Sequence, residues 1–248
     1  MLEVQNLMVF YENALGLNDL SIEVRAGQMV GIIGSNSAGK TTLMNTLSGL
    51  ILDMRIKELR KGGERITVFG KVLFEGQDVT DVMPHERARR GLVLARERHP
   101  IFPDSTVVEN LRIAGYLRPW KDIREESEQA FQMFPNLKRW KNRKAGFLSG
   151  GEQQMLAIAM ALMVRPKVLL LDEPLLGLSP AMQKQLVSAI REISVQSNVT
   201  LVIAEQFARP LLPLLDFAYV IENGMLTMTG PGPELMQNPE IKSAYFGV

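Results

Sequence analysis

Nine residues near the N-terminus, GSNSAGKTT at 34–42, have the types and spacing that bind phosphate. They follow an apolar run at 29–33 and precede a helical pattern, which predicts a strand, a glycine-rich turn and a helix start. Backbone N–H groups of such a turn converge on an anion, and the helix dipole assists them. Lys40 is placed to reach the β- and γ-phosphates, and the Thr41 hydroxyl is placed to ligate Mg²⁺. We therefore expect a nucleoside triphosphate and Mg²⁺ to be held by Gly34, Ser35, Asn36, Ser37, Ala38, Gly39, Lys40, Thr41 and Thr42.

Ser37 is the irregular position of this turn. If the backbone requires a positive φ there, serine costs roughly 1 kcal/mol relative to glycine. The serine is then either neutral or a cause of weak nucleotide binding. Only the second hypothesis predicts that Ser37→Gly tightens binding.

Two carboxylates follow a second apolar run, in the sequence VLLLDEP at 168–174. The end of a buried parallel strand is where open α/β sheets place their ligands. Asp172 would hold Mg²⁺ directly or through water, and Glu173 would polarise the attacking water as a general base.

A second glycine motif, LSGGEQQ at 148–154, stands before the apolar helical pattern MLAIAMALMV. Its glycines free the backbone, and the helix start offers N–H donors to an anion. The chain therefore carries two candidate anion sites.

Composition limits the other possibilities. The 248 residues have a formal net charge of +1 and contain no cysteine. This balance gives no reason to expect nucleic acid as the main partner, and the missing cysteines exclude disulfides. No apolar run reaches the roughly 18 residues of a membrane span. We expect a cytoplasmic protein.

The order of patterns predicts an α/β core with two kinds of sheet. Residues 2–10, 20–24 and 66–74 resemble half-exposed antiparallel strands, whereas 29–33, 91–95, 167–171 and 200–204 resemble buried parallel strands. Helical spacing fills 107–164, without a strand. We expect a first core part at 1–97 with an antiparallel β subdomain, a helical lobe at 98–164, and a second core part at 165–248.

LSGGEQQ, GSNSAGKTT and LLLDEP, in this order and spacing, resemble the ATP-binding subunits of ABC transporters over essentially the whole chain. The resemblance implies a P-loop ABC ATPase fold with the signature in the helical lobe. It also implies a head-to-tail dimer in which Ser149, Gly150, Gly151 and Glu152 face the ATP bound by a partner. Tyr11 would stack on adenine; alternatively it is an aromatic residue packed beside a strand.

The sequence is most similar to the shorter ATPase subunit of branched-chain amino acid importers, through GLSP at 177–180, AEQ at 204–206 and Glu97. Gln206 occupies the place of the usual switch histidine and would act in catalysis with Glu173 and Lys40. Glu97 would ligate Mg²⁺; the alternative is a solvated loop carboxylate. Ser179 replaces the usual aspartate, and residues 51–72 exceed the family length by about a dozen. This insertion is either a solvated surface segment or a contact for a partner or lipid.

The resemblance implies an ATPase that powers an importer from the inner face of the cell membrane. Its partners would be two permease subunits, a paralogous ATPase in a heterodimer or a second copy in a homodimer, and an extracytoplasmic binding protein. Importers of urea, amides or other amino acids remain alternatives. So do a nucleotide-binding regulatory module and a non-transport ABC ATPase.

Overall fold

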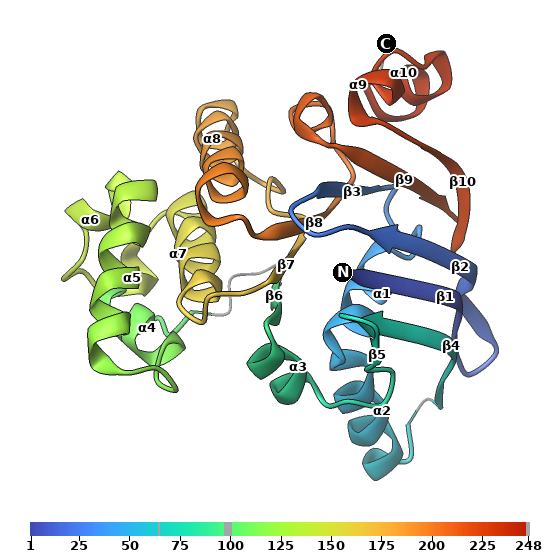
Figure 1. Cartoon of the computed structure of the whole chain (residues 1–248), viewed down its shortest axis with the longest axis horizontal. Coiled ribbons are helices and arrows are strands. Elements are labelled where there is room, and N and C mark those ends of the chain that lie inside the picture. The colour runs from blue at the N-terminus through green and yellow to red at the C-terminus, as the bar shows by residue number, and fades with distance from the viewer. Residues whose placement is uncertain (64, 97–100, 247–248) are drawn as a thin grey trace.

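The computed structural model describes residues 1–63, 65–96 and 101–246. Two β-sheets stand beside a group of helices, which lie to the left in Figure 1. The strands are β1 Leu2–Tyr11, β2 Ala14–Val24, β3 Met29–Ile33, β4 Ile66–Phe74, β5 Gln77–Asp78, β6 Leu92–Ala95, β7 Val168–Asp172, β8 Thr200–Glu205, β9 Phe217–Glu222 and β10 Met225–Gly230. The helices are α1 Lys40–Ser48, α2 Leu50–Lys61, α3 Pro84–Arg90, α4 Val107–Ala114, α5 Trp120–Met133, α6 Pro135–Arg139, α7 Gly150–Leu162, α8 Pro180–Ser197, α9 Gly232–Leu235 and α10 Pro239–Phe246, with short 3-10 turns at Ala145–Phe147 and Leu212–Leu214.

The larger sheet has the order β10-β9-β3-β8-β7-β6. The pairs from β9 to β6 are parallel, and β10 is antiparallel at the edge. β3, β7 and β8 are buried along their whole length, as parallel strands covered on both faces are. Their carboxyl ends therefore place the residues that follow them at one edge of the sheet.

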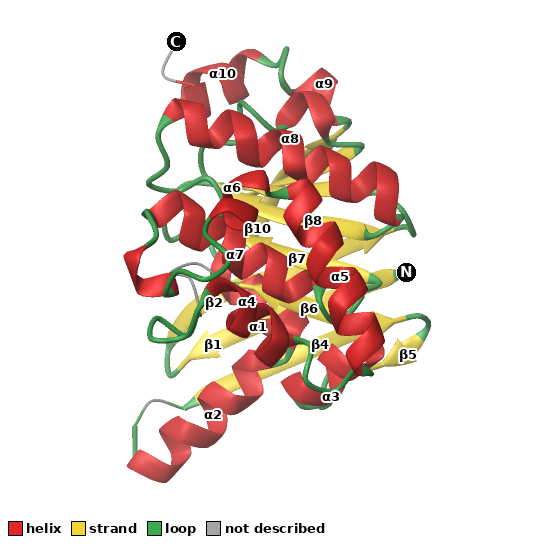
Figure 2. Cartoon of the chain, turned by 90° about the vertical axis from the view of Figure 1, so that its left-hand side faces the viewer, coloured by secondary structure: helices red, strands yellow, loops and turns green. Residues whose placement is uncertain are grey.

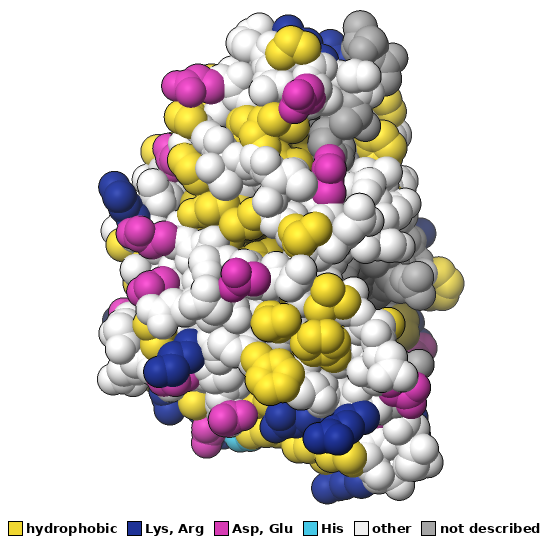
Figure 3. Space-filling view, turned by 90° about the vertical axis from the view of Figure 1, so that its right-hand side faces the viewer, with side chains coloured by type: hydrophobic (Ala, Val, Ile, Leu, Met, Phe, Trp, Pro, Cys, Tyr) yellow, Lys and Arg dark blue, Asp and Glu magenta, His cyan; other side chains and the backbone are white. Residues whose placement is uncertain are grey.

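The smaller sheet, β2-β1-β4-β5, is antiparallel. Its strands alternate buried and exposed residues over much of their length, so one face joins the core and the other faces solvent. Figure 3 views the end of the molecule where these strands turn, and hydrophobic side chains gather there beside Lys and Arg. Phe10 and Phe69 meet edge to face on this sheet with ring centroids 6.2 Å apart.

Two hydrophobic cores share the larger sheet. Leu169 and Leu171 of β7 pack with the helices α4 to α8. Val168 and Leu170, which alternate with them, pack with α1 and the smaller sheet. Because successive strand residues point to opposite faces, one strand contributes to both cores and α1 lies between the two sheets.

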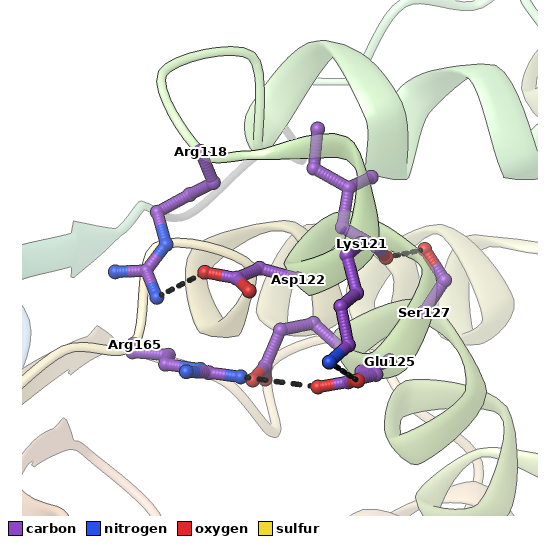
Figure 4. A network of polar contacts seen from close by, with 8 residues as sticks. Arg118, Lys121, Asp122, Glu125, Ser127 and Arg165 are labelled. Atoms are coloured by element: carbon purple, nitrogen blue, oxygen red, sulfur yellow. Dashed lines mark hydrogen bonds and ion pairs between the residues drawn. The ribbon is translucent and has the colours of Figure 1, made fainter.

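Charged side chains join the helical lobe to the turn that enters β7. Arg165, just after α7, pairs with Glu126 and lies 3.9 Å from the Glu125 carboxylate of α5. Figure 4 shows this arrangement and the Arg118–Asp122 pair, which is 3.1 Å long. The Arg165 contacts hold the middle of α5 against the end of α7.

The segment 51–72 is not a loop. Its first part forms α2, which projects from the body in Figure 2, and its last part belongs to β4. Ile51 and Leu52 are buried, residues 53–56 are half-buried, and four of the last five α2 residues are exposed. Two glycines, Gly62 and Gly63, end the helix, and Gly62 has a φ of 66°, a conformation that favours glycine.

Most predicted elements are confirmed. The described residues of 107–164 contain α4 to α7 and no strand. All four predicted buried strands are present, and each observed end lies within one residue of the predicted end. β2 begins at Ala14, not near Leu20, because residues 14–17 pair with the end of β1. The hairpin β9–β10 was not predicted.

Candidate functional site

The phosphate loop lies between β3 and α1 and is held by close backbone packing. A Cβ on Gly34 would come within 2.5 Å of the Ile221 carbonyl oxygen, and one on Gly39 within 2.8 Å of the Gly16 carbonyl oxygen. Gly39 also has a φ of 108° and leaves the start of α1 without a side-chain cap. The first amides of α1 are therefore available to an anion.

Ser37 has a φ of 64°. The backbone at this position is therefore left-handed, which is the case in which serine was expected to be strained. Serine carries strain of roughly 1 kcal/mol there.

Lys40 lies over the loop with its side chain buried. Its Nζ donates to the carbonyl oxygens of Gly34 and Ser35, both at 3.0 Å. It also lies 3.0 Å from Oε1 of Glu173. This ion pair joins the loop after β3 to the loop after β7, so the structure brings the predicted lysine and base together.

Glu173 follows β7 in a left-handed conformation, with a φ of 47°. Its backbone N–H donates to the Ala204 carbonyl at 2.9 Å, and its side chain is 11% exposed. A non-glycine residue held in this region is strained. The carboxylate is directed toward Lys40 and lines the cavity described next.

A cavity of about 600 Å³ lies over the loop. The described residues that line it are Leu15, Gly16, Asn36, Ser37, Gly39, Lys40, Thr41, Thr42, Glu173, Leu176, Asn223 and Gly224. Its size falls in the usual range of small-molecule sites. Tyr11 reaches its border, with its hydroxyl 3.4 Å from Thr42 Oγ1.

Thr41 and Asp172 provide the oxygen atoms suited to a hard cation. The Thr41 hydroxyl donates to Asp172 Oδ1 at 3.4 Å, and Asp172 is 3% exposed. Hydroxyl and carboxylate oxygens beside a phosphate site match the donor set of Mg²⁺, which takes its remaining ligands from phosphate and water. Glu97, the third predicted ligand, lies outside the described residues.

Glu205 is a titratable residue near this site that sequence reasoning missed. It ends β8, is 3% exposed, and accepts a hydrogen bond of 2.7 Å from the Leu175 backbone N–H. Its pKa is raised to about 7, mainly by burial and also by the nearby Glu173, while the amides of Leu175 and Gln206 and the charge of Lys40 act in the opposite direction. The available signal was a carboxylate at the end of the apolar run TLVIAE.

Gln206 follows Glu205 and is half-buried. It is not among the described residues that line the cavity. Its role in catalysis therefore stays a prediction.

The glycine motif at 148–154 leads into α7, and its residues are not among the described residues that line the cavity. Ser149 caps the helix by accepting from the Glu152 N–H at 3.4 Å. The Glu152 carboxylate accepts from the N–H and the hydroxyl of Ser149, both at 2.9 Å. Gly150 faces open space, whereas a Cβ on Gly151 would come within 2.6 Å of Met182 Cε. Ser179 caps α8 through the Met182 N–H.

Comparisons with known proteins identify the family. The family model described as ABC transporter matches residues 17–176. A high-affinity branched-chain amino acid transport ATP-binding protein, BraG of Pseudomonas aeruginosa, is 36% identical over the full length of both chains. A lipopolysaccharide export system ATP-binding protein, LptB of Haemophilus influenzae, is 29% identical over 99% of this chain and 97% of its own.

A solved structure, an ATP-binding cassette of an ABC transporter in its ADP conformation, is also similar. It has a TM-score of 0.79 at 28% identity and covers 100% of this chain and 99% of its own. No helix within the described ranges is long and apolar enough to cross a membrane. With a matching family model and a full-length relative at 36% identity, the chain belongs to the ABC transporter family, as an ATP-hydrolysing, ATP-binding subunit.

Proposed function

We propose that the chain hydrolyses ATP to power an importer of branched-chain amino acids. The observation that carries this proposal is the convergence of Lys40, Thr41 and Glu173 on one cavity, in a chain that matches BraG over its full length. Urea, amides and other amino acids are alternative cargoes, because separate chains select the cargo.

In this proposal the loop amides and Lys40 bind the β- and γ-phosphates. Lys40 Nζ turns from the carbonyls of Gly34 and Ser35 toward the phosphates, which offer it a stronger, charge-assisted bond. Thr41 and Asp172 would hold Mg²⁺, which supplies charge neutralisation at the phosphates. Tyr11 borders the cavity from β1 and would contact the adenine.

Glu173 is the proposed general base. Its release from Lys40 leaves an ionised carboxylate at the cavity wall, where it can accept a proton from a water that attacks the γ-phosphate. Gln206 would donate a neutral hydrogen bond to the γ-phosphate, which is weaker than one from a charged histidine. Glu97 remains a proposed metal ligand.

The start of α7 would bind the γ-phosphate of an ATP held by a partner subunit. This role would account for the absence of Ser149 to Glu152 from the described residues that line the chain's own cavity. We propose a paralogous ATPase as that partner, with a homodimer as the alternative. Two permease subunits on the inner face of the membrane and an extracytoplasmic binding protein complete the proposed system.

The test of hydrolysis is Glu173→Gln. Loss of the base should lower kcat by at least ~100-fold. ATP binding should be retained or tightened, because Lys40 loses its competing carboxylate. Glu12→Gln on the β1–β2 turn is the control and should leave both constants unchanged. Full activity of Glu173→Gln would remove Glu173 from catalysis.

The test of the transport role is gentle solubilisation of native membranes and isolation of the chain with its partners. Two polytopic membrane proteins and a second ATPase with an LSGG motif would support the importer. Reconstitution with the matching binding protein then identifies cargo and direction. Recovery of soluble partners only would contradict the proposal.

A further inference from the structure

The Glu152 carboxylate receives a third donor that the helix cap does not explain. Its Oε2 accepts the N–H and hydroxyl of Ser149, the reciprocal pairing typical of helix starts. Its Oε1 accepts a hydrogen bond of 2.9 Å from the indole Nε1–H of Trp140. Trp140 lies just after α6, outside the capped helix.

Two guanidinium groups accompany this indole. Arg139 and Arg143 lie with their Cζ atoms 4.8 Å and 4.9 Å from the centroid of the Trp140 ring. Cations at this distance are attracted to the ring. We call Arg139, Trp140 and Arg143 the Trp140 cluster. It places positive charge and one N–H donor behind the Glu152 carboxylate.

The proposed function creates a conflict at this helix start. A hydroxyl has one hydrogen to donate, and that of Ser149 points to Glu152. Binding of a partner's γ-phosphate requires this hydrogen to turn toward the phosphate. The negatively charged Glu152 carboxylate would then lie beside the negatively charged γ-phosphate, and this charge repulsion is unfavourable.

We propose that Trp140 is a positioning residue for this anion site, an inference that rests on the proposed function. When the Ser149 hydroxyl turns away, Glu152 keeps two donors, the Ser149 N–H and the Trp140 indole. The indole bond holds the carboxylate on the side of the Trp140 cluster. The hydroxyl and amides of the helix start are thereby left to the phosphate.

Trp140→Phe tests the indole donor and keeps an aromatic ring for the two arginines. The preparation is the transporter complex isolated with the chain. We expect kcat/KM for ATP to fall roughly three- to tenfold, about the net value of one ordinary hydrogen bond. The Kd for ADP of the isolated chain should stay within twofold, because its own phosphate loop is intact. Trp120→Phe is the matched control, since Arg112 lies 5.0 Å from that ring in a similar contact.

A double-mutant cycle separates positioning from folding. Glu152→Gln removes the negative charge that Trp140 restrains, so Trp140→Phe should cost less than twofold in that background. An equal loss in both backgrounds, or no loss in either, would overturn the inference. Absence of any ATP hydrolysis in the unsubstituted complex would instead refute the proposed function.

Fluorescence provides a second measurement that does not require Trp140→Phe to fold. The chain has two tryptophans. In the variant Trp120→Phe, Trp140 is therefore the single tryptophan that this chain contributes. The Glu173→Gln substitution and ATP together should trap the closed complex. The Trp140 emission should then shift, because the Ser149 hydroxyl no longer shares the Glu152 carboxylate with the indole, and it should remain constant with ADP. Unchanged emission in a trapped complex would contradict the inference.

Discussion

The carboxylate of Glu205 accepts a 2.7 Å hydrogen bond from the backbone N–H of Leu175. Glu205 precedes Gln206 at the end of β8, and Leu175 lies two residues after Glu173. One buried contact therefore joins the segments that carry the two residues proposed to act in hydrolysis.

This contact predicts a pH-dependent stability. The pKa of Glu205 is raised from 4.5 to about 7, so between these values the folded chain keeps a proton that the unfolded chain has lost. The free energy of unfolding should therefore fall as pH rises from 4.5 to 7, by on the order of 3 kcal/mol, and then stay level. Urea unfolding of wild type and Glu205→Gln measures this. The variant should lack the decrease and be the more stable at pH 8; equal slopes would exclude Glu205 as its source.

Hydrolysis should show the same ionisation. Above pH 7, Glu205 adds negative charge near Lys40 and Glu173, which opposes a triphosphate. We expect the KM for ATP to rise severalfold between pH 6 and 8, to become flat in Glu205→Gln, and to keep its inflection in Gln206→Ala. An inflection that disappears in Gln206→Ala would contradict the assignment of this titration to Glu205.

Ser37→Gly should stabilise the fold by up to about 1 kcal/mol, because it removes a left-handed serine. We expect the strain at Ser37 to be the same with and without bound nucleotide. The Kd for ADP should therefore stay within threefold. Thermal unfolding and titration with a fluorescent ADP measure the two quantities. The neighbouring Asn36→Gly is the control, since Asn36 is not left-handed and should only lose stability. A large gain in affinity for Ser37→Gly would revive the weak-binding hypothesis.

Arg87 should be essential to the fold. It is fully buried and donates to the carbonyl oxygens of Thr46, Leu47, Thr80 and Val82 at 2.7–2.8 Å. Burial lowers its pKa to about 10, so it remains charged at neutral pH. Arg87→Met leaves these carbonyls without their donor and should cost roughly 3–5 kcal/mol in urea unfolding. Arg89→Met, on the exposed side of α3, should cost under about 0.5 kcal/mol.

Sequence patterns predicted the parts of the site that are local in the chain. The phosphate loop and the Asp172–Glu173 pair each follow an apolar run, and the strand end alone fixes their place. Contacts between distant segments were not predictable. Glu205 and Leu175 are 30 residues apart, and Arg87 reaches Thr46 across 41. Both pairs depend on which elements are neighbours in space.

The helix α2 shows a different limit. Its sequence LILDMRIKELRK has a helical pattern with basic residues in its last turn, but the extra length of residues 51–72 alone does not indicate whether they form a loop or a helix. Trp140 was missed for a third reason. A partly buried tryptophan usually packs in a core, and no pattern shows that its N–H meets Glu152.

Successive residues of β7 pack in two different cores, so the two faces of this strand belong to layers that can open separately. Val168 and Leu170 belong to the layer that encloses α1, whereas Leu169 and Leu171 belong to the helical layer. Local opening of the helices need not loosen the layer around the phosphate loop, because cooperative units open independently. We therefore expect the amide hydrogens of α5 and α7 to exchange before those of α1, which native-state hydrogen exchange measures.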